Sequence, residues 1–155
     1  MPTTKDTAEA YHVGLVYGLV DPRRAIAWAD RTIAASQHAD PAVIAVSSAW
    51  AQGMGAIASA LRQVPGRSDP SPVLRILLAL VDDVMSPGPA TTDDVARALD
   101  RIAFDEAIEG CDLQNELSGM GNAIDLARDG LYGNLDEARA DVVRFVRTHR
   151  ADVVD

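Results

Sequence analysis

The sequence has few of the residues that build covalent or metal-linked folds. It contains one cysteine, Cys111, among 155 residues. A single thiol cannot form an intramolecular disulfide, and it excludes a zinc site made from several thiolates. This cysteine usage is typical of a reducing cytoplasm, which we predict as the compartment. Aromatic residues make up only 5% of the chain, and this scarcity favours helices over sheets.

Spacings typical of catalytic sites are also missing. The histidines show no H-x-x-x-H or E-x-x-H spacing, which argues against zinc proteases and di-iron bundles. Cys111 has no base near it in sequence, so we expect a small buried residue and not a nucleophile. We therefore predict no catalytic residue, no bound metal and no cofactor, although an enzyme is not excluded. The histidines are His12, His38 and His149.

No stretch of the sequence carries a clear targeting or membrane signal. The apolar run Val13 to Val20 has acids before it and no small-residue cleavage site after it, unlike a signal peptide. Residues 42–61 carry no formal charge and could cross a bilayer by length. Their serines, glycines and alanines make insertion marginal. We expect either one buried helix or two short helices broken near Gln52-Gly53.

Helix signals run along nearly the whole chain. Asp21-Pro22 and Asp40-Pro41 each place a capping carboxylate before a proline suited to the first turn. The first of these helices should end near Gln37. The prolines and glycine of residues 65–72 predict a loop, and residues 73–85 are apolar almost all round, which predicts the most buried helix.

The second half shows the same signals. Thr91 or Thr92 should cap a helix that reaches Ile102, after an end at "SPGPA" (residues 86–90). Residues 113–128 should form another helix, and Asn134 with Glu137 predicts a capping box for a last one. We predict an all-α single domain over residues 1–155. It should be an orthogonal bundle of six or seven helices around the 73–85 helix.

Two smaller features yield specific expectations. Trp28 lies off the apolar stripe of its helix, so it should face the N-terminal segment or serve as an exposed interface anchor. Trp50 lies in the uncharged stretch and should belong to the core. The sequences "GMGAI" at residue 53 and "GMGNAI" at residue 119 resemble each other, and we interpret them as points of close approach between helices.

Charge is unevenly divided between the halves. Residues 1–80 hold six acids and seven lysines or arginines, whereas residues 81–155 hold seventeen acids and seven arginines. Such an acidic half disfavours nucleic acid and anionic membranes as partners. It favours a basic protein, a divalent cation, or simply a solvated surface. The near-neutral half could also meet the acidic half of another copy through Arg23, Arg24 and Arg31, so a homo-oligomer is possible.

The densest acidic stretch is "FDEAIEGCDLQNE", residues 104–116, with five carboxylates. In a helix, Asp105, Glu109, Asp112 and Glu116 would line one face at steps of four, three and four. Gly110 argues against a continuous helix, so the stretch could be one helix or two.

"DEAIE", residues 105–109, resembles the paired-acid motif of the all-α nucleotide pyrophosphohydrolases. That resemblance implies Mg²⁺- or Mn²⁺-dependent hydrolysis of a nucleotide-like phosphate through Asp105, Glu106, Glu109 and Asp125. Asn122 stands where the family's second motif has a glutamate, and this departure puts metal loading in doubt.

Residues 19–33 and 125–138 together resemble small acidic helical proteins of bacteria, some of them suspected immunity proteins against secreted toxins. The resemblance implies a cytoplasmic all-α protein with a binding role. Our preferred prediction is an immunity- or antitoxin-like inhibitor that docks a basic protein, such as a toxin, through its acidic half. The docking residues would be Asp93, Asp94, Asp105, Glu106, Glu109, Asp112 and Glu116. The metal-dependent hydrolase is the alternative.

Overall fold

The computed structural model describes the backbone of residues 1–85 and 89–152. Within these ranges there is no strand, which confirms the all-α class. The same ranges contain eight α-helices of at least eight residues, where we expected six or seven, and two four-residue pieces. The elements are α1 (Thr4–Val16), α2 (Pro22–Ala35), α3 (Pro41–Ser48), the 3-10 turn η1 (Ala49–Gln52), α4 (Met54–Gln63), α5 (Pro70–Met85), α6 (Pro89–Ile102), α7 (Gln114–Leu117), α8 (Met120–Arg128) and α9 (Leu135–His149).

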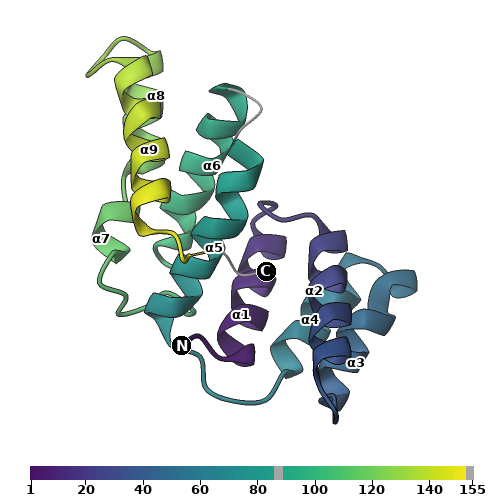
Figure 1. Cartoon of the computed structure of the whole chain (residues 1–155). Helices are drawn as coiled ribbons and strands as arrows, with labels where there is room; N and C mark the ends of the chain where they lie inside the picture. Colours follow the sequence, from purple (N-terminus) through teal and green to yellow (C-terminus); the bar gives the residue numbers. More distant parts are fainter. Residues whose placement is uncertain (86–88, 153–155) are drawn as a thin grey trace.

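Helix α5 lies between two groups of helices, as Figure 1 shows. Helix α1 packs along one side of it and joins α2, α3 and α4 into an N-terminal part. Helices α6 and α9 pack on the other side and join α8 into a C-terminal part. Residues 73–85 are heavily buried, since Val73, Leu74, Leu77, Leu78 and Val81 are all fully buried, but α1 buries as many residues as α5, so α5 does not stand out as the most buried helix.

Three of the side chains predicted to start helices do so. Asp21 accepts a hydrogen bond from the Arg23 amide at 2.8 Å, and Asp40 accepts one from the Ala42 amide at 2.8 Å. The Asn134 side-chain oxygen accepts from the Asp136 and Glu137 amides at the start of α9. This is half of the capping box we predicted, because the Glu137 side chain makes no return bond to the Asn134 amide; the complete capping box in the described residues lies at Thr3 and Asp6 of α1. These bonds satisfy amides that have no partner within their own helix, and they therefore set where each helix begins.

Two helix boundaries differ from those predicted. Helix α6 begins at Pro89, so Thr91 and Thr92 lie inside its first turn and do not cap it. Residues 86–88 of "SPGPA" lie outside the described residues. The helix expected over 113–128 divides into α7 and α8, because Gly119 has a φ of 94° and breaks the backbone direction.

The uncharged stretch forms two short helices, the second of the two forms we expected. Helix α3 passes into η1, Gly53 adopts a φ of 92°, and α4 follows. Gly53 and Gly119 thus precede α4 and α8 with a positive φ in both cases, although their ψ angles, 176° and −6°, differ. Among the described residues, no helix combines the length and apolar character that a membrane crossing requires.

The two tryptophans have opposite environments. Trp28 is buried and its ring packs against Tyr11 of α1 with centroids 5.6 Å apart. This confirms the contact with the N-terminal segment and excludes an exposed anchor. Trp50 is 52% exposed, so its assignment to the core was wrong. It lies on the η1 turn, so membership of the uncharged stretch did not bury it, and the Arg23 guanidinium lies 5.8 Å from its ring centroid.

Candidate functional site

Residues 103–113, which we call the acidic turn segment, are not helical. Successive turns form instead: the Ile108 amide bonds the Asp105 carbonyl at 3.0 Å, and the Cys111 amide bonds the Ile108 carbonyl at 3.0 Å. Gly110 has a φ of 82°, which a helix cannot accommodate. The single carboxylate stripe that a helix would create is therefore absent. Ile108 and Cys111 are buried and hold the segment against the core.

Asp105 is a structural residue of this segment. One carboxylate oxygen accepts from the Ala107 amide at 2.9 Å, and the other accepts from the Tyr17 hydroxyl at 2.9 Å. Burial, together with this bond to Asp105, raises the pKa of Tyr17. The carboxylate thus shapes a local turn and ties the segment to the end of α1.

Asp93 does not belong to any accessible surface, which corrects its assignment as a docking residue. It is 1% exposed. Arg139 of α9 reaches it with two hydrogen bonds of 2.8 Å, and Arg128 of α8 forms a further ion pair with it. The Arg139 bonds, aided by Arg128, hold the pKa of Asp93 below its usual value. This carboxylate joins three helices and cannot pair with a partner.

Asp94 and Asp125 share one arginine. Arg97 lies 2.8 Å from Asp125 on α8 and 3.5 Å from Asp94 on its own helix. The three side chains line an open groove of about 680 Å³ beside α6 and α8, and Tyr17 lies at its edge. Tyr17 also donates to Asp105, so this one side chain connects the groove to the acidic turn segment.

Glu106 and Asp112 are exposed but pair with arginines from earlier in the chain. Glu106 lies 2.9 Å from Arg62, and Asp112 lies 3.2 Å from Arg75. Asp112 also accepts from the Ser71 hydroxyl at 3.1 Å. Hydrogen bonds from the Cys111 thiol and the Ser71 hydroxyl lower the pKa of Asp112. Part of the acidic excess is therefore balanced within the chain.

Glu109 and Glu116 are the least constrained of the predicted residues. Glu116, on α7, approaches the His149 ring at 4.0 Å. Within the described part of the chain, Glu109 forms no ion pair and its side chain makes no hydrogen bond, and it is exposed. These two carboxylates have the most freedom to meet a partner.

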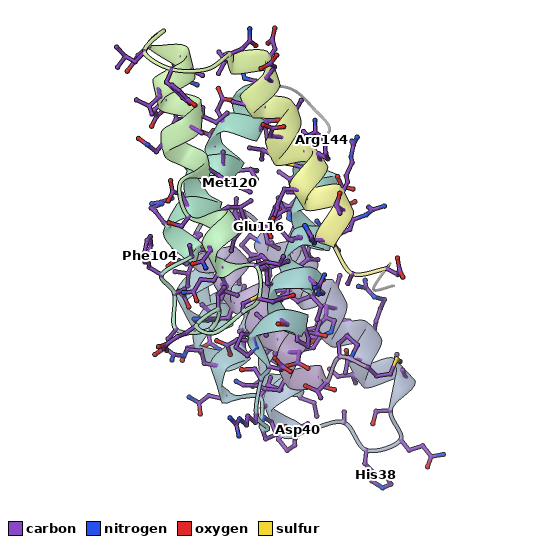
Figure 2. The ribbon with its side chains drawn as sticks, turned by 90° about the vertical axis from the view of Figure 1, so that its left-hand side faces the viewer. His38, Asp40, Phe104, Glu116, Met120 and Arg144 are labelled. Atoms are coloured by element: carbon purple, nitrogen blue, oxygen red, sulfur yellow. The ribbon has the colours of Figure 1, made fainter. Side chains whose placement is uncertain are left out.

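Phe104 is the functional candidate that the sequence analysis missed. Its side chain is 77% exposed and projects from the edge of the molecule (Figure 2). It precedes Asp105 and Glu106 directly, so an apolar ring stands among carboxylates. The available signal was an aromatic residue just after the last turn of the predicted 91–102 helix, followed at once by two acids.

The described residues do not form a metal centre. Among them, no three His, Cys, Asp or Glu side chains lie close enough to hold an ion. Of the acids in the pyrophosphohydrolase-like set, Asp105 bonds Tyr17, Glu106 pairs with Arg62, and Asp125 pairs with Arg97. This geometry gives the hydrolase alternative no support. The Cys111 thiol is buried, and burial raises its pKa, which is unlike an activated nucleophile.

The arginines proposed for self-association are partly engaged within the chain. Arg24 pairs with Asp83 at 2.8 Å, and Arg23 stacks over Trp50.

Comparison of the sequence with protein-family models finds no match, and comparisons with curated proteins and with solved structures find none either.

Proposed function

We propose that the protein is a cytoplasmic binding module that docks a basic protein partner through Phe104 and the carboxylates beside it. An immunity- or antitoxin-like inhibitor is the concrete form of this proposal. The orthogonal helix packing that we expect would serve as its rigid support.

The exposed Phe104 carries the proposal. When a partner covers a phenyl ring that is 77% exposed, apolar surface is removed from water, and this favours binding. Aromatic residues at the centre of an interface often dominate its binding energy. Carboxylates around the ring would exclude partners with acidic surfaces and favour those with lysine or arginine around an apolar pocket.

In this proposal, exposed carboxylates of the acidic half complete the docking surface. Glu106, Glu109 and Glu116 are exposed, and Asp94 lines the groove beside α6 and α8. Such carboxylates raise the rate of association with a cationic partner more than they slow its dissociation. Association should therefore slow as ionic strength rises, while the lifetime of the complex depends on Phe104.

A pair of double variants tests the proposal. Phe104→Ala with Glu109→Lys alters the candidate surface at residues that make no structural ion pair in the described part of the chain. Tyr132→Ala with Asp129→Lys makes the same chemical change in the loop before α9, where Tyr132 is 78% exposed. Each protein is immobilised, and partners are captured from the source cell's lysate at low salt and identified by mass spectrometry.

We expect the native protein and the Tyr132/Asp129 variant to retain the same basic protein, and the Phe104/Glu109 variant to lose it. Purified partner should then associate more slowly at high salt. Equal capture by all three proteins would contradict the proposal, as would a captured partner with an acidic contact surface.

A further inference from the structure

One cleft is lined mainly by positive side chains, in contrast to the acidic chain as a whole. It has a volume of about 330 Å³ and lies between α1, α2, α5 and the residues that follow α9. Its walls carry Arg24, Arg31 and Arg150, and the one acid among the lining residues is Asp83. The lining residues thus carry a formal charge of about +2, in a protein whose net charge is −9.

Two of the three guanidinium groups are held in place. Arg24 donates to the Leu80 carbonyl at 2.8 Å and to Asp83 at 2.8 Å. Arg150, from the segment after α9, donates to Asp82 of α5 at 2.6 Å. An arginine has five N–H donors, so each keeps donors for a ligand after these bonds. Fixing the side chains in advance lowers the entropy lost when a ligand binds.

Arg31 differs from the other two. Within the described part of the chain it forms no ion pair, although it lines the same cleft as Asp83. It lies two helical turns after Arg24, so both project from the same face of α2. A guanidinium without a carboxylate partner beside two fixed ones is suited to an incoming anion.

Tyr11 and apolar side chains complete the cleft. Burial raises the pKa of Tyr11, so its hydroxyl stays protonated and can donate to an anion. Ile76, Ala79 and Leu80 supply an apolar surface beside the charged groups. A pocket of this size with convergent polar groups and an apolar wall fits a small organic molecule.

We propose that this cleft binds a small phosphate monoester, with the phosphate at Arg24, Arg31 and Arg150 and the organic part against Ile76 and Leu80. A monoester carries close to two negative charges at neutral pH, which matches the charge of the lining residues. A tetrahedral phosphate also offers oxygens in several directions, which suits donors that come from two different segments, α2 and the residues after α9, whereas a carboxylate offers two oxygens in one plane. The site is separate from the Phe104 surface and independent of the function proposed there.

Titration calorimetry at low salt tests the site with phenyl phosphate, inorganic phosphate, phenol and phthalate. We expect phenyl phosphate to bind saturably and more tightly than inorganic phosphate, and phenol not to bind. Arg31→Gln should weaken phenyl phosphate at least about tenfold, because a charge-assisted hydrogen bond is lost. Arg144→Gln removes the same charge on α9 at an exposed residue that does not line the cleft, and should leave the affinity within about twofold.

Tyr11→Phe serves as a second variant that removes only the hydroxyl, and it should weaken phenyl phosphate several-fold. Far-UV circular dichroism and the thermal midpoint confirm that each variant is folded. The proposal is overturned if neither phosphate binds at millimolar concentration, or if Arg31→Gln and Arg144→Gln reduce the affinity equally. Phthalate that binds as tightly as phenyl phosphate would overturn the choice of a phosphate ligand.

Discussion

The N-terminal and C-terminal parts of this protein rest on the same helix, α5, but use charged residues differently. In the N-terminal part, aspartates mainly cap helices: Asp21 begins α2 and Asp40 begins α3. Within the described residues of that part, the one ion pair is Lys5 with Glu9. In the C-terminal part, carboxylates join helices to one another, as Asp93 joins α6 to α8 and α9.

The comparison shows that the number of acidic residues in a sequence does not tell how many carboxylates are exposed and unpaired at the surface. Asp82 is largely buried and binds both Arg147 and Arg150. Asp100 accepts from the Gly119 and Asn122 amides at the start of α8. Many of the excess carboxylates are therefore engaged in ion pairs and hydrogen bonds within the chain. A smaller set of residues in the acidic half, with Phe104, remains accessible to a partner.

The largest effect should come from the helix that both parts share. Leu77→Ala removes a fully buried side chain from α5 and should lower the free energy of unfolding by about 2–5 kcal/mol. Urea unfolding followed by tryptophan fluorescence, which reports the N-terminal part because Trp28 and Trp50 both lie there, should coincide with unfolding followed by circular dichroism. Two separate transitions would show that the parts unfold independently.

A smaller effect should come from the buried ion pairs of Asp93 in the C-terminal part. Asp93→Asn keeps the shape of the side chain but removes the charge that Arg128 and Arg139 bind. Because both arginines are partly exposed, we expect a loss of about 2–3 kcal/mol rather than the full cost of an unpaired buried charge. Asp94→Asn on the exposed side of the same helix is the control and should change stability by less than about 0.5 kcal/mol. Equal losses would contradict this contrast.

The same ion pairs predict that the stability of the fold depends on pH. The folded pKa of Asp93 lies below the ordinary value of 3.8, so the charged form stabilises the fold fully above that value. The stabilisation is lost as the pH falls below about 4 towards the folded pKa. Urea unfolding from pH 7 to pH 3 should show the difference between the native protein and Asp93→Asn shrinking at the acid end. A difference that stays constant would be inconsistent with the assignment.

The two "GMG" sequences, one in each part, should respond oppositely to alanine. A Cβ at Gly121 would lie 3.0 Å from the Arg97 Cα of α6, so Gly121→Ala should cost about 1–2 kcal/mol through overpacking. A Cβ at Gly55 would meet nothing within 4 Å, so Gly55→Ala should stabilise α4 by about 0.5 kcal/mol. Thermal unfolding of both variants measures the contrast, and two shifts of the same sign would refute it.

The smallest effect should come from an ion pair that links the two parts. Arg62 and Glu106 are 55% and 78% exposed at their side chains, so Arg62→Ala should lower stability by less than about 0.5 kcal/mol, and by less again at high salt. Equilibrium unfolding at two ionic strengths measures this. A loss above about 1 kcal/mol would show that charge pairs contribute substantially to holding the two parts together.

Local sequence signals predicted the helical elements well. Asp-Pro pairs at residues 21 and 40 act through bonds to amides two residues away, so their effect is visible without tertiary information. The apolar character of residues 73–85 predicted their burial in the same way. The helix start at Pro89 was missed because Thr91 and Thr92 have suitable side chains but lie one turn too late.

The candidate site was less predictable, because pairing across the fold decides which charges stay free. Asp93 and Glu109 look alike in the sequence, yet one is buried under two arginines and the other is exposed. Helical spacing suggested a stripe through Asp105 and Asp112, but Gly110 and the burial of Ile108 favour turns. Trp50 was misplaced because a 3-10 turn changes the direction of side chains that a regular helix would bury.

The central place of α5 restricts how this chain can be divided. The connection at residues 64–69 resembles a natural boundary, since it separates α1–α4 from everything that follows. A fragment that ended there would leave the inner side of α1 facing water, because α5 is the wall against which α1 packs. The smallest piece that could be exchanged or recombined with other proteins therefore includes α5. Removing that piece would leave α6 and α9 of the C-terminal part without the helix they pack against.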